Sequence, residues 1–112
     1  MSITATHHNA TMASVTLGAN VLGGADAVEF SGVVRELGEN GVAKLVIDMS
    51  AVQVMNSSGL GMLVASLSTM RKYGGTVLFS DVPQNVQALL KMTHLDSVFK
   101  MYSTIQEALD SQ

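Results

Sequence analysis

Hydrophobic positions along the chain change their period several times, and each change predicts a new strand or helix. Five segments are short, rich in β-branched or apolar residues and bounded by turn residues, which is typical of strands. They cover residues 3–8, 12–22, 45–47, 76–82 and 98–102. Residues 45–47 read Leu-Val-Ile without a polar position, as expected for a strand that is buried on both faces of a parallel sheet.

Four other segments place apolar residues at the spacing of one helix face. The first helix carries Phe30, Val33, Val34 and Leu37, with a capping box of Asp26 and Glu29 at its start and Gly38 and Gly41 at its end. The second carries Leu60, Leu63, Val64, Leu67 and Met70 and ends at residues 71–75. The third has Pro83 in its first turn and Val86, Leu89 and Leu90 facing inward, and the last opens with a capping box from Ser103 to Gln106.

The resulting order is β-β-α-β-α-β-α-β-α. Such alternation predicts an α/β sandwich with a mixed, largely parallel sheet of about five strands and four helices. We expect residues 1–112 to form a single domain, because the length suits one compact unit and no linker or repeat interrupts it.

Composition narrows the class of protein. No apolar run approaches the roughly 18 to 20 residues that span a bilayer, and the first residues do not resemble a signal peptide. Cys is absent, the net charge is −3 and the six Lys and Arg are scattered. We therefore expect a cytoplasmic protein without disulfides, membrane insertion or direct nucleic-acid binding.

The segment Val52–Leu63, VQVMNSSGLGML, concentrates the polar residues of interest. It joins a central parallel strand to the next helix, and ligands gather beyond the carboxyl ends of such strands. Asn56, Ser57 and Ser58 are suited to helix capping, and Gly59 and Gly61 to close packing of the helix on the sheet. Capping alone is one reading of this segment.

Catalytic and cofactor-binding readings find little support. The two glycines lack the third glycine of a dinucleotide loop, and no Lys follows them as a Walker A loop requires. The nucleophile elbow G-x-S-x-G is absent, and no spacing supports a triad of Ser57, His94 and an aspartate. Adjacent His7 and His8 are possible metal ligands, but neighbouring residues of a strand point to opposite faces, and no carboxylate cluster is near them. We expect no catalytic residue, no metal site and no cofactor, so the protein is not expected to be an enzyme.

Residues 45–75 resemble the STAS domain of bacterial anti-sigma factor antagonists. The family pattern is an apolar strand, D-x-S/T, a few apolar residues, D-S-S/T-G-L-G and an amphipathic helix that ends near paired glycines. The matching positions are Asp48, Ser50, Val52, Val54, Met55, Asn56, Ser57, Ser58, Gly59, Leu60, Gly61 and the pair Gly74 and Gly75. The predicted order of elements also matches the family over essentially the whole chain.

The resemblance implies a phosphorylation-controlled partner switch that regulates sigma-factor-dependent transcription. It places the phosphorylation site at Ser57, with Ser58 as the second choice. The implied partners are a serine kinase with a histidine-kinase-type ATP fold, which also acts as an anti-sigma factor, and a PP2C-type phosphatase. The unphosphorylated protein would bind the kinase and free the sigma factor. The expected partner-binding residues are Met55, Asn56, Ser58, Gly59, Leu60 and Met62.

Two positions depart from the family pattern. Asn56 replaces the usual acid of the motif, and the segment 18–26, GANVLGGAD, lacks the acidic residue that often follows its first glycine. The alternative is therefore a constitutive STAS subunit of a larger signalling or transport complex that is not phosphorylated.

Overall fold

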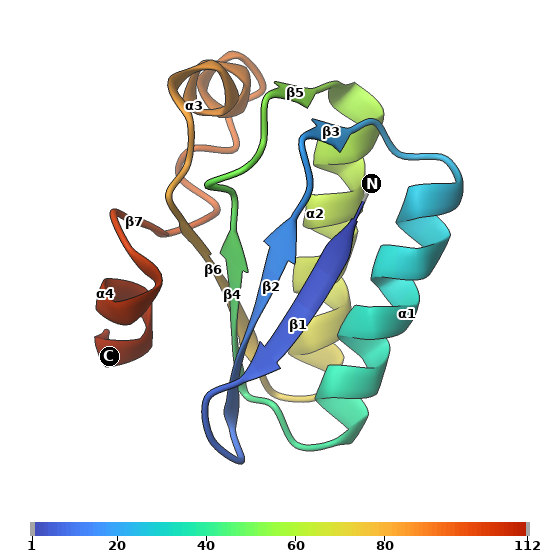
Figure 1. Cartoon of the computed structure of the whole chain (residues 1–112), viewed down its shortest axis with the longest axis vertical. Helices are drawn as coiled ribbons and strands as arrows, with labels where there is room; N and C mark the ends of the chain where they lie inside the picture. Colours follow the sequence, from blue (N-terminus) through green and yellow to red (C-terminus); the bar gives the residue numbers. More distant parts are fainter. Residues whose placement is uncertain (1, 112) are drawn as a thin grey trace.

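The computed structural model describes residues 2–111 and contains a five-stranded sheet in the order β1-β2-β4-β6-β7 (Figure 1). Its strands are β1 (Ile3–His7), β2 (Met12–Leu17), β4 (Lys44–Asp48), β6 (Thr76–Ser80) and β7 (Met101–Tyr102). β1 pairs with β2 antiparallel, and the other three pairings are parallel. The prediction of a mixed, largely parallel sheet is confirmed.

The helices are α1 (Ala25–Glu39), α2 (Ser57–Lys72), α3 (Gln84–Met92) and α4 (Ile105–Asp110), as many as the sequence predicts. Figure 1 shows α1 and α2 side by side along one face of the sheet, with α4 on the opposite side. α3 lies at the end of the sheet toward which the parallel strands run.

The core explains why Leu45, Val46 and Ile47 of the central strand β4 are all apolar. Leu45 and Ile47 of β4 belong to the main hydrophobic cluster under α1 and α2, while Val46 faces α4 and packs with Ala108. All three β4 side chains are fully buried, so the expected two-sided burial is confirmed. The predicted stripe of α2 also faces the core, with Val64 only partly buried.

The predicted strand over residues 12–22 is divided. β2 ends at Leu17, and a separate two-residue strand, β3 (Asn20–Val21), pairs with β5 (Val54–Met55) in a small second sheet. Gly18 lies between them with its N–H donated to the Ser2 carbonyl at 2.8 Å. The Ala19 carbonyl then accepts from the N–H groups of Gln53 and Val54. These bonds redirect the chain away from the main sheet and toward the start of α2.

Several predicted element ends shift in the structure. α1 starts at Ala25 with Gly24 as its N-cap residue, so Asp26 lies in the first turn instead of capping. Gly38 does not end this helix but lies within it, where an added Cβ would meet the ring of Tyr73 at 2.5 Å. The chain leaves α1 through Gly41, whose φ is +95°.

The last two elements are also displaced slightly from their predicted positions. Only Met101 and Tyr102 of the predicted edge strand over 98–102 pair with β6. The final capping box lies one residue later than expected, because Thr104 Oγ1 accepts from the N–H of Glu107 at 3.1 Å. The Glu107 carboxylate in turn accepts from the N–H of Ser103.

Candidate partner-binding site

The turn after β4 is held by the motif aspartate. Asp48 is buried, and its Oδ1 accepts a hydrogen bond from the N–H of Ser50 at 2.9 Å. Its other oxygen accepts from Thr16 Oγ1 of β2 at 3.1 Å. One carboxylate therefore fixes the turn that follows β4 and ties it to the neighbouring strand, so this residue has a structural role.

A close backbone contact then positions the N-terminus of α2. A Cβ added to Gly59 would lie 2.0 Å from the carbonyl oxygen of Val21, far inside any normal contact. The same carbonyl accepts from the N–H of Asn56 at 3.3 Å. Gly23, with a φ of +82°, approaches Ser58 in a similar way. The loop after β3 thus packs directly against the first turn of α2 (Figure 1).

Asn56 is the N-cap residue of α2. Its side-chain Oδ1 accepts from the N–H of Gly59 at 2.8 Å, while its backbone carbonyl accepts from the N–H of Leu60 at 2.9 Å. This amide provides the hydrogen bond that an aspartate in the family motif would provide. The replacement therefore removes a negative charge without removing the cap.

Ser57 and Ser58 follow the cap and are both exposed. Neither hydroxyl is hydrogen-bonded to another residue in the part of the chain that the structure describes, and their backbone N–H groups have no protein acceptor there. Unpaired N–H groups at a helix start carry partial positive charge and stabilise anions. A phosphate on Ser57 is therefore compatible with an intact helix.

The exposed surface around Ser57 combines polar and apolar side chains that carry no charge. We call it the Ser57 platform, consisting of Leu22, Val54, Asn56, Ser57 and Ser58. Leu22 and Val54 are 46% and 49% exposed although both are large hydrophobic residues. Residues 12–25 and 49–70, which supply the platform, contain no Asp, Glu, Lys or Arg. A phosphate would place the first charge on the side chains of these two segments.

The structure distributes the six expected partner-binding residues between surface and interior. Asn56 and Ser58 are exposed and Met55 is half-buried. Gly59 is buried, and Leu60 and Met62 are only 3% and 5% exposed, as part of the main core. The side chains available to a partner are therefore those of the platform and Met55. The sequence analysis included Val54 in the motif but not among the contact residues, and it did not single out Leu22, which precedes Gly23 and Gly24.

Residues 2–111 show neither a hydrogen-bonded catalytic partner for Ser57 nor a cluster of metal ligands. Within residues 2–111, no hydrogen bond joins Ser57 to His94 or to a carboxylate. His8 Nε2 lies 2.9 Å from Ser14 Oγ, on β2. No group of three or more His, Asp or Glu with metal-binding geometry occurs among those residues. None of their helices has the length and apolar character to cross a bilayer.

Comparison with known proteins identifies the family of this chain. A family model of the STAS domain matches residues 9–108. The chain belongs to the STAS domain family. A protein of Thermotoga neapolitana that is named as an anti-sigma factor antagonist is 32% identical over 78 residues, which are 70% of this chain and 69% of the relative. The anti-sigma-F factor antagonist RsfB of Mycobacterium tuberculosis is 29% identical, over 97% of this chain and 87% of its own.

This STAS domain also superimposes on solved structures. The anti-sigma factor antagonist SpoIIAA in its unphosphorylated form gives a TM-score of 0.83, covers 97% of this chain and 94% of its own, and is 13% identical. The same-named Bacillus cell fate determinant in its phosphorylated form gives a TM-score of 0.76. At such low identity these similarities support the fold, which confirms the expected STAS-type sandwich.

Proposed function

We propose that this STAS domain is an anti-sigma factor antagonist whose binding to its partner is controlled by phosphorylation of Ser57. In its unphosphorylated form it binds an anti-sigma factor that is also a serine kinase with a histidine-kinase-type ATP fold. Phosphorylation by that kinase ends the complex, and a PP2C-type phosphatase restores it. The protein acts as a binding switch in the cytoplasm and not as an enzyme.

The exposure of Ser57 on an uncharged platform is the observation that carries the proposal. Within residues 2–111 the hydroxyl has no hydrogen-bond partner, and it lies at the first residue of α2, so a kinase can reach it without unfolding the helix. The names of the relatives in Thermotoga and Mycobacterium support the antagonist role. SpoIIAA, which shares the fold, has been solved in both phosphorylation states.

The switch follows from charge and not from a change of fold. A phosphate adds about −1.5 to −2 charges at neutral pH. The exposed side chains of Leu22 and Val54 favour a partner with an apolar surface, and burying a charge there without a cation costs several kcal/mol. Since about 1.4 kcal/mol is a factor of ten in affinity, binding weakens by roughly a hundredfold or more.

Site-mapped phosphopeptide mass spectrometry on the protein from its native cells tests the modification, in growth and under stress. We expect phosphate on Ser57 with an occupancy that changes between the two conditions. An unmodified Ser57 in both conditions, with good coverage of residues 49–70, would contradict the switch. That result would favour the constitutive STAS subunit, for which Asn56 in place of the motif acid is the supporting observation.

A further inference from the structure

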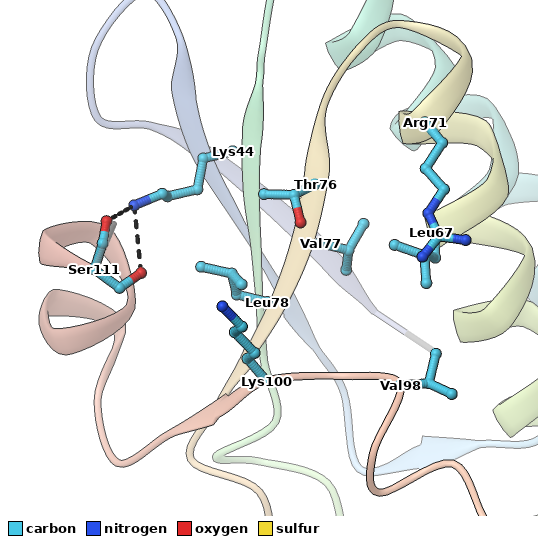
Figure 2. A pocket seen from close by; sticks show the side chains of 9 residues that line it. All are labelled: Lys44, Leu67, Arg71, Thr76, Val77, Leu78, Val98, Lys100 and Ser111. Atoms are coloured by element: carbon cyan, nitrogen blue, oxygen red, sulfur yellow. Dashed lines mark hydrogen bonds between the residues drawn. The ribbon is translucent and has the colours of Figure 1, made fainter.

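The two edges of the main sheet differ in what covers them. One edge ends in β7, which is only two residues long, and Val77 and Leu78 of β6, which β7 does not reach, are buried. α4 packs on this part of the sheet, and the Nζ of Lys44 donates to the Ser111 carbonyl at the end of that helix (Figure 2). At the other edge, β1 pairs with β2 alone (Figure 1). The long open edge of the sheet within residues 2–111 is therefore that of β1.

Hydrogen bonds at the two ends of β1 show which of its backbone groups point outward. The Ser2 carbonyl accepts from the N–H of Gly18 at 2.8 Å, and the N–H of His8 donates to the Met12 carbonyl at 2.9 Å. Ser2 and His8 are thus hydrogen-bonded positions of the antiparallel ladder, and such positions alternate along a strand. The even-numbered residues of β1 therefore bond to β2, whereas the odd-numbered residues direct their N–H and C=O groups to the open edge.

The outward residues are Ile3, Ala5 and His7. Ala5 and His7 are exposed and Ile3 is half-buried, and Thr4 and Thr6 between them are exposed as well. Within residues 2–111 the outward backbone groups have no partner, because no strand lies on that side of β1. A row of free donors and acceptors therefore follows an accessible strand.

This edge lacks the features that keep natural strand edges apart. Exposed edges commonly carry Lys or Pro, or are interrupted by a β-bulge. Residues 2–25 contain no Asp, Glu, Lys, Arg or Pro, and β1 pairs with β2 over five consecutive positions without a bulge. Ile and Thr also have a high strand propensity. Although the chain has a net charge of −3, no acidic or basic side chain of β1 opposes the approach of a second β1 strand.

We propose that β1 pairs antiparallel with β1 of a second copy of this chain, with Ala5 on the two-fold axis. In this register Ala5 lies opposite Ala5 of the second copy, and Ile3 lies opposite His7 of the second copy. Every outward donor then meets an acceptor, which gives about six backbone hydrogen bonds. On the other face of the strand, Thr4 lies opposite Thr6 of the second copy, and Thr pairs of this kind stabilise neighbouring strands.

A second copy is the occupant that an uncharged, self-complementary strand favours, because β1 offers no acidic or basic side chain to a charged partner. The two-fold pairing consumes the open edge of both copies, and the opposite edge of each sheet ends in the short β7, so association stops at the dimer. Strands of five residues bury less than the roughly 1,200 Å² of stable interfaces, so the dimer is weak, with a dissociation constant of about 0.1 mM. This edge contains no residue of the Ser57 platform, and the inference therefore goes beyond the antagonist function.

A dilution series of the unmodified chain tests dimer formation by analytical ultracentrifugation and NMR. We expect mainly monomer at about 10 µM and mainly dimer at about 1 mM, as a dissociation constant of about 0.1 mM requires. In the ¹⁵N-labelled protein, the amide signals of Ile3, Ala5 and His7 should shift as the concentration rises. Exchange of the Ala5 N–H should slow at least about threefold over this range, because the second copy supplies its acceptor.

Charges introduced at Ala5 test the register. Ala5→Glu places two carboxylates opposite each other and Ala5→Lys two ammonium groups, so each variant alone should dimerise at least about tenfold more weakly. An equimolar mixture of the two variants should regain the dimer, because opposite charges then face each other. Ala65→Glu, at an exposed position of α2, is the matched control and should leave dimerisation unchanged. Circular dichroism checks that all three variants keep the fold.

Three results would overturn the proposal. The first is a monomer at the highest concentration, which would leave this edge to a different protein. The second is a dimer whose formation leaves the amide signals of Ile3, Ala5 and His7 unchanged, which would place the contact elsewhere. The third is a mixture of folded Ala5→Glu and Ala5→Lys chains that stays monomeric, which would exclude the register with Ala5 on the axis.

Discussion

Gly59 and Gly61, two glycines near the start of α2, are predicted to respond in opposite ways to replacement by alanine. A Cβ on Gly59 would lie 2.0 Å from the Val21 carbonyl oxygen and 2.7 Å from its carbon. Normal contacts between carbon and oxygen are at about 3.3 Å, so the loop must move by about 1.3 Å. Such movement disturbs the hydrogen bond from Asn56 to Val21 and the pairing of Val21 with Met55.

The magnitude follows from two opposing terms. Overpacking costs about 1 to 3 kcal/mol, and the upper value applies to Gly59 because the contact is with backbone. Alanine in place of glycine within a helix stabilises it by about 0.5 to 1 kcal/mol. Gly59→Ala should therefore lower the free energy of unfolding by about 2 kcal/mol. Gly61 has no heavy atom within 4 Å of an added Cβ, so Gly61→Ala should raise it by about 0.5 to 1 kcal/mol.

Urea unfolding followed by circular dichroism measures both changes, since the chain has no Trp for fluorescence. With a slope of about 1 to 3 kcal/mol per molar urea, Gly59→Ala should lower the midpoint by about 1 M. Gly61→Ala is the matched control in the same helix. Equal stability of the two variants would refute the argument that the close approach of Val21 requires glycine at position 59.

Three further variants test other parts of the account by the same unfolding assay. Asn56→Ala should lower the free energy of unfolding by about 1 kcal/mol, because it removes the cap. Asn56→Asp should keep the cap and raise that free energy by up to about 1 kcal/mol, because its charge interacts with the helix dipole. An equal loss in both variants would contradict the capping role. Ser80→Ala should stabilise by about 1 kcal/mol, because the Ser80 hydroxyl is buried without a partner within residues 2–111; a clear loss would show that it is bonded. Lys44→Met should cost about 2 kcal/mol by freeing the carbonyls at the end of α4, and an unchanged midpoint would show that these bonds contribute nothing.

The sequence predicts those helices and strands that bury either one face or all of their side chains. The apolar stripe of α2 and the run Leu45–Ile47 both occupy the predicted core positions, because periodicity and burial have the same physical cause there. β3 and β5 are not predictable in this way, since strands of two residues have no period. They form because the chain is redirected by long-range hydrogen bonds at Ala19.

The candidate site is predicted less completely than the fold. Asn56 and Ser57 occupy the expected start of α2, since caps are local features of sequence. Leu60 and Met62 were expected at a contact surface, yet both are buried. α2 packs against the sheet and also against α1, so two adjacent stripes of this helix are covered. β7 pairs with β6 only at Phe79 and Ser80, and no local pattern reveals where this pairing begins.

The affinity of this STAS domain for its proposed partner, a serine kinase with a histidine-kinase-type ATP fold, tests the central claim most directly. Titration calorimetry should compare Ser57→Ala, Ser57→Asp and the control Ser68→Asp, an exposed serine eleven residues further along α2. We predict that Ser57→Ala and Ser68→Asp bind as tightly as the unmodified protein, and that Ser57→Asp binds at least about tenfold more weakly, since each factor of ten is about 1.4 kcal/mol. Equal affinity of Ser57→Ala and Ser57→Asp would contradict a switch at Ser57.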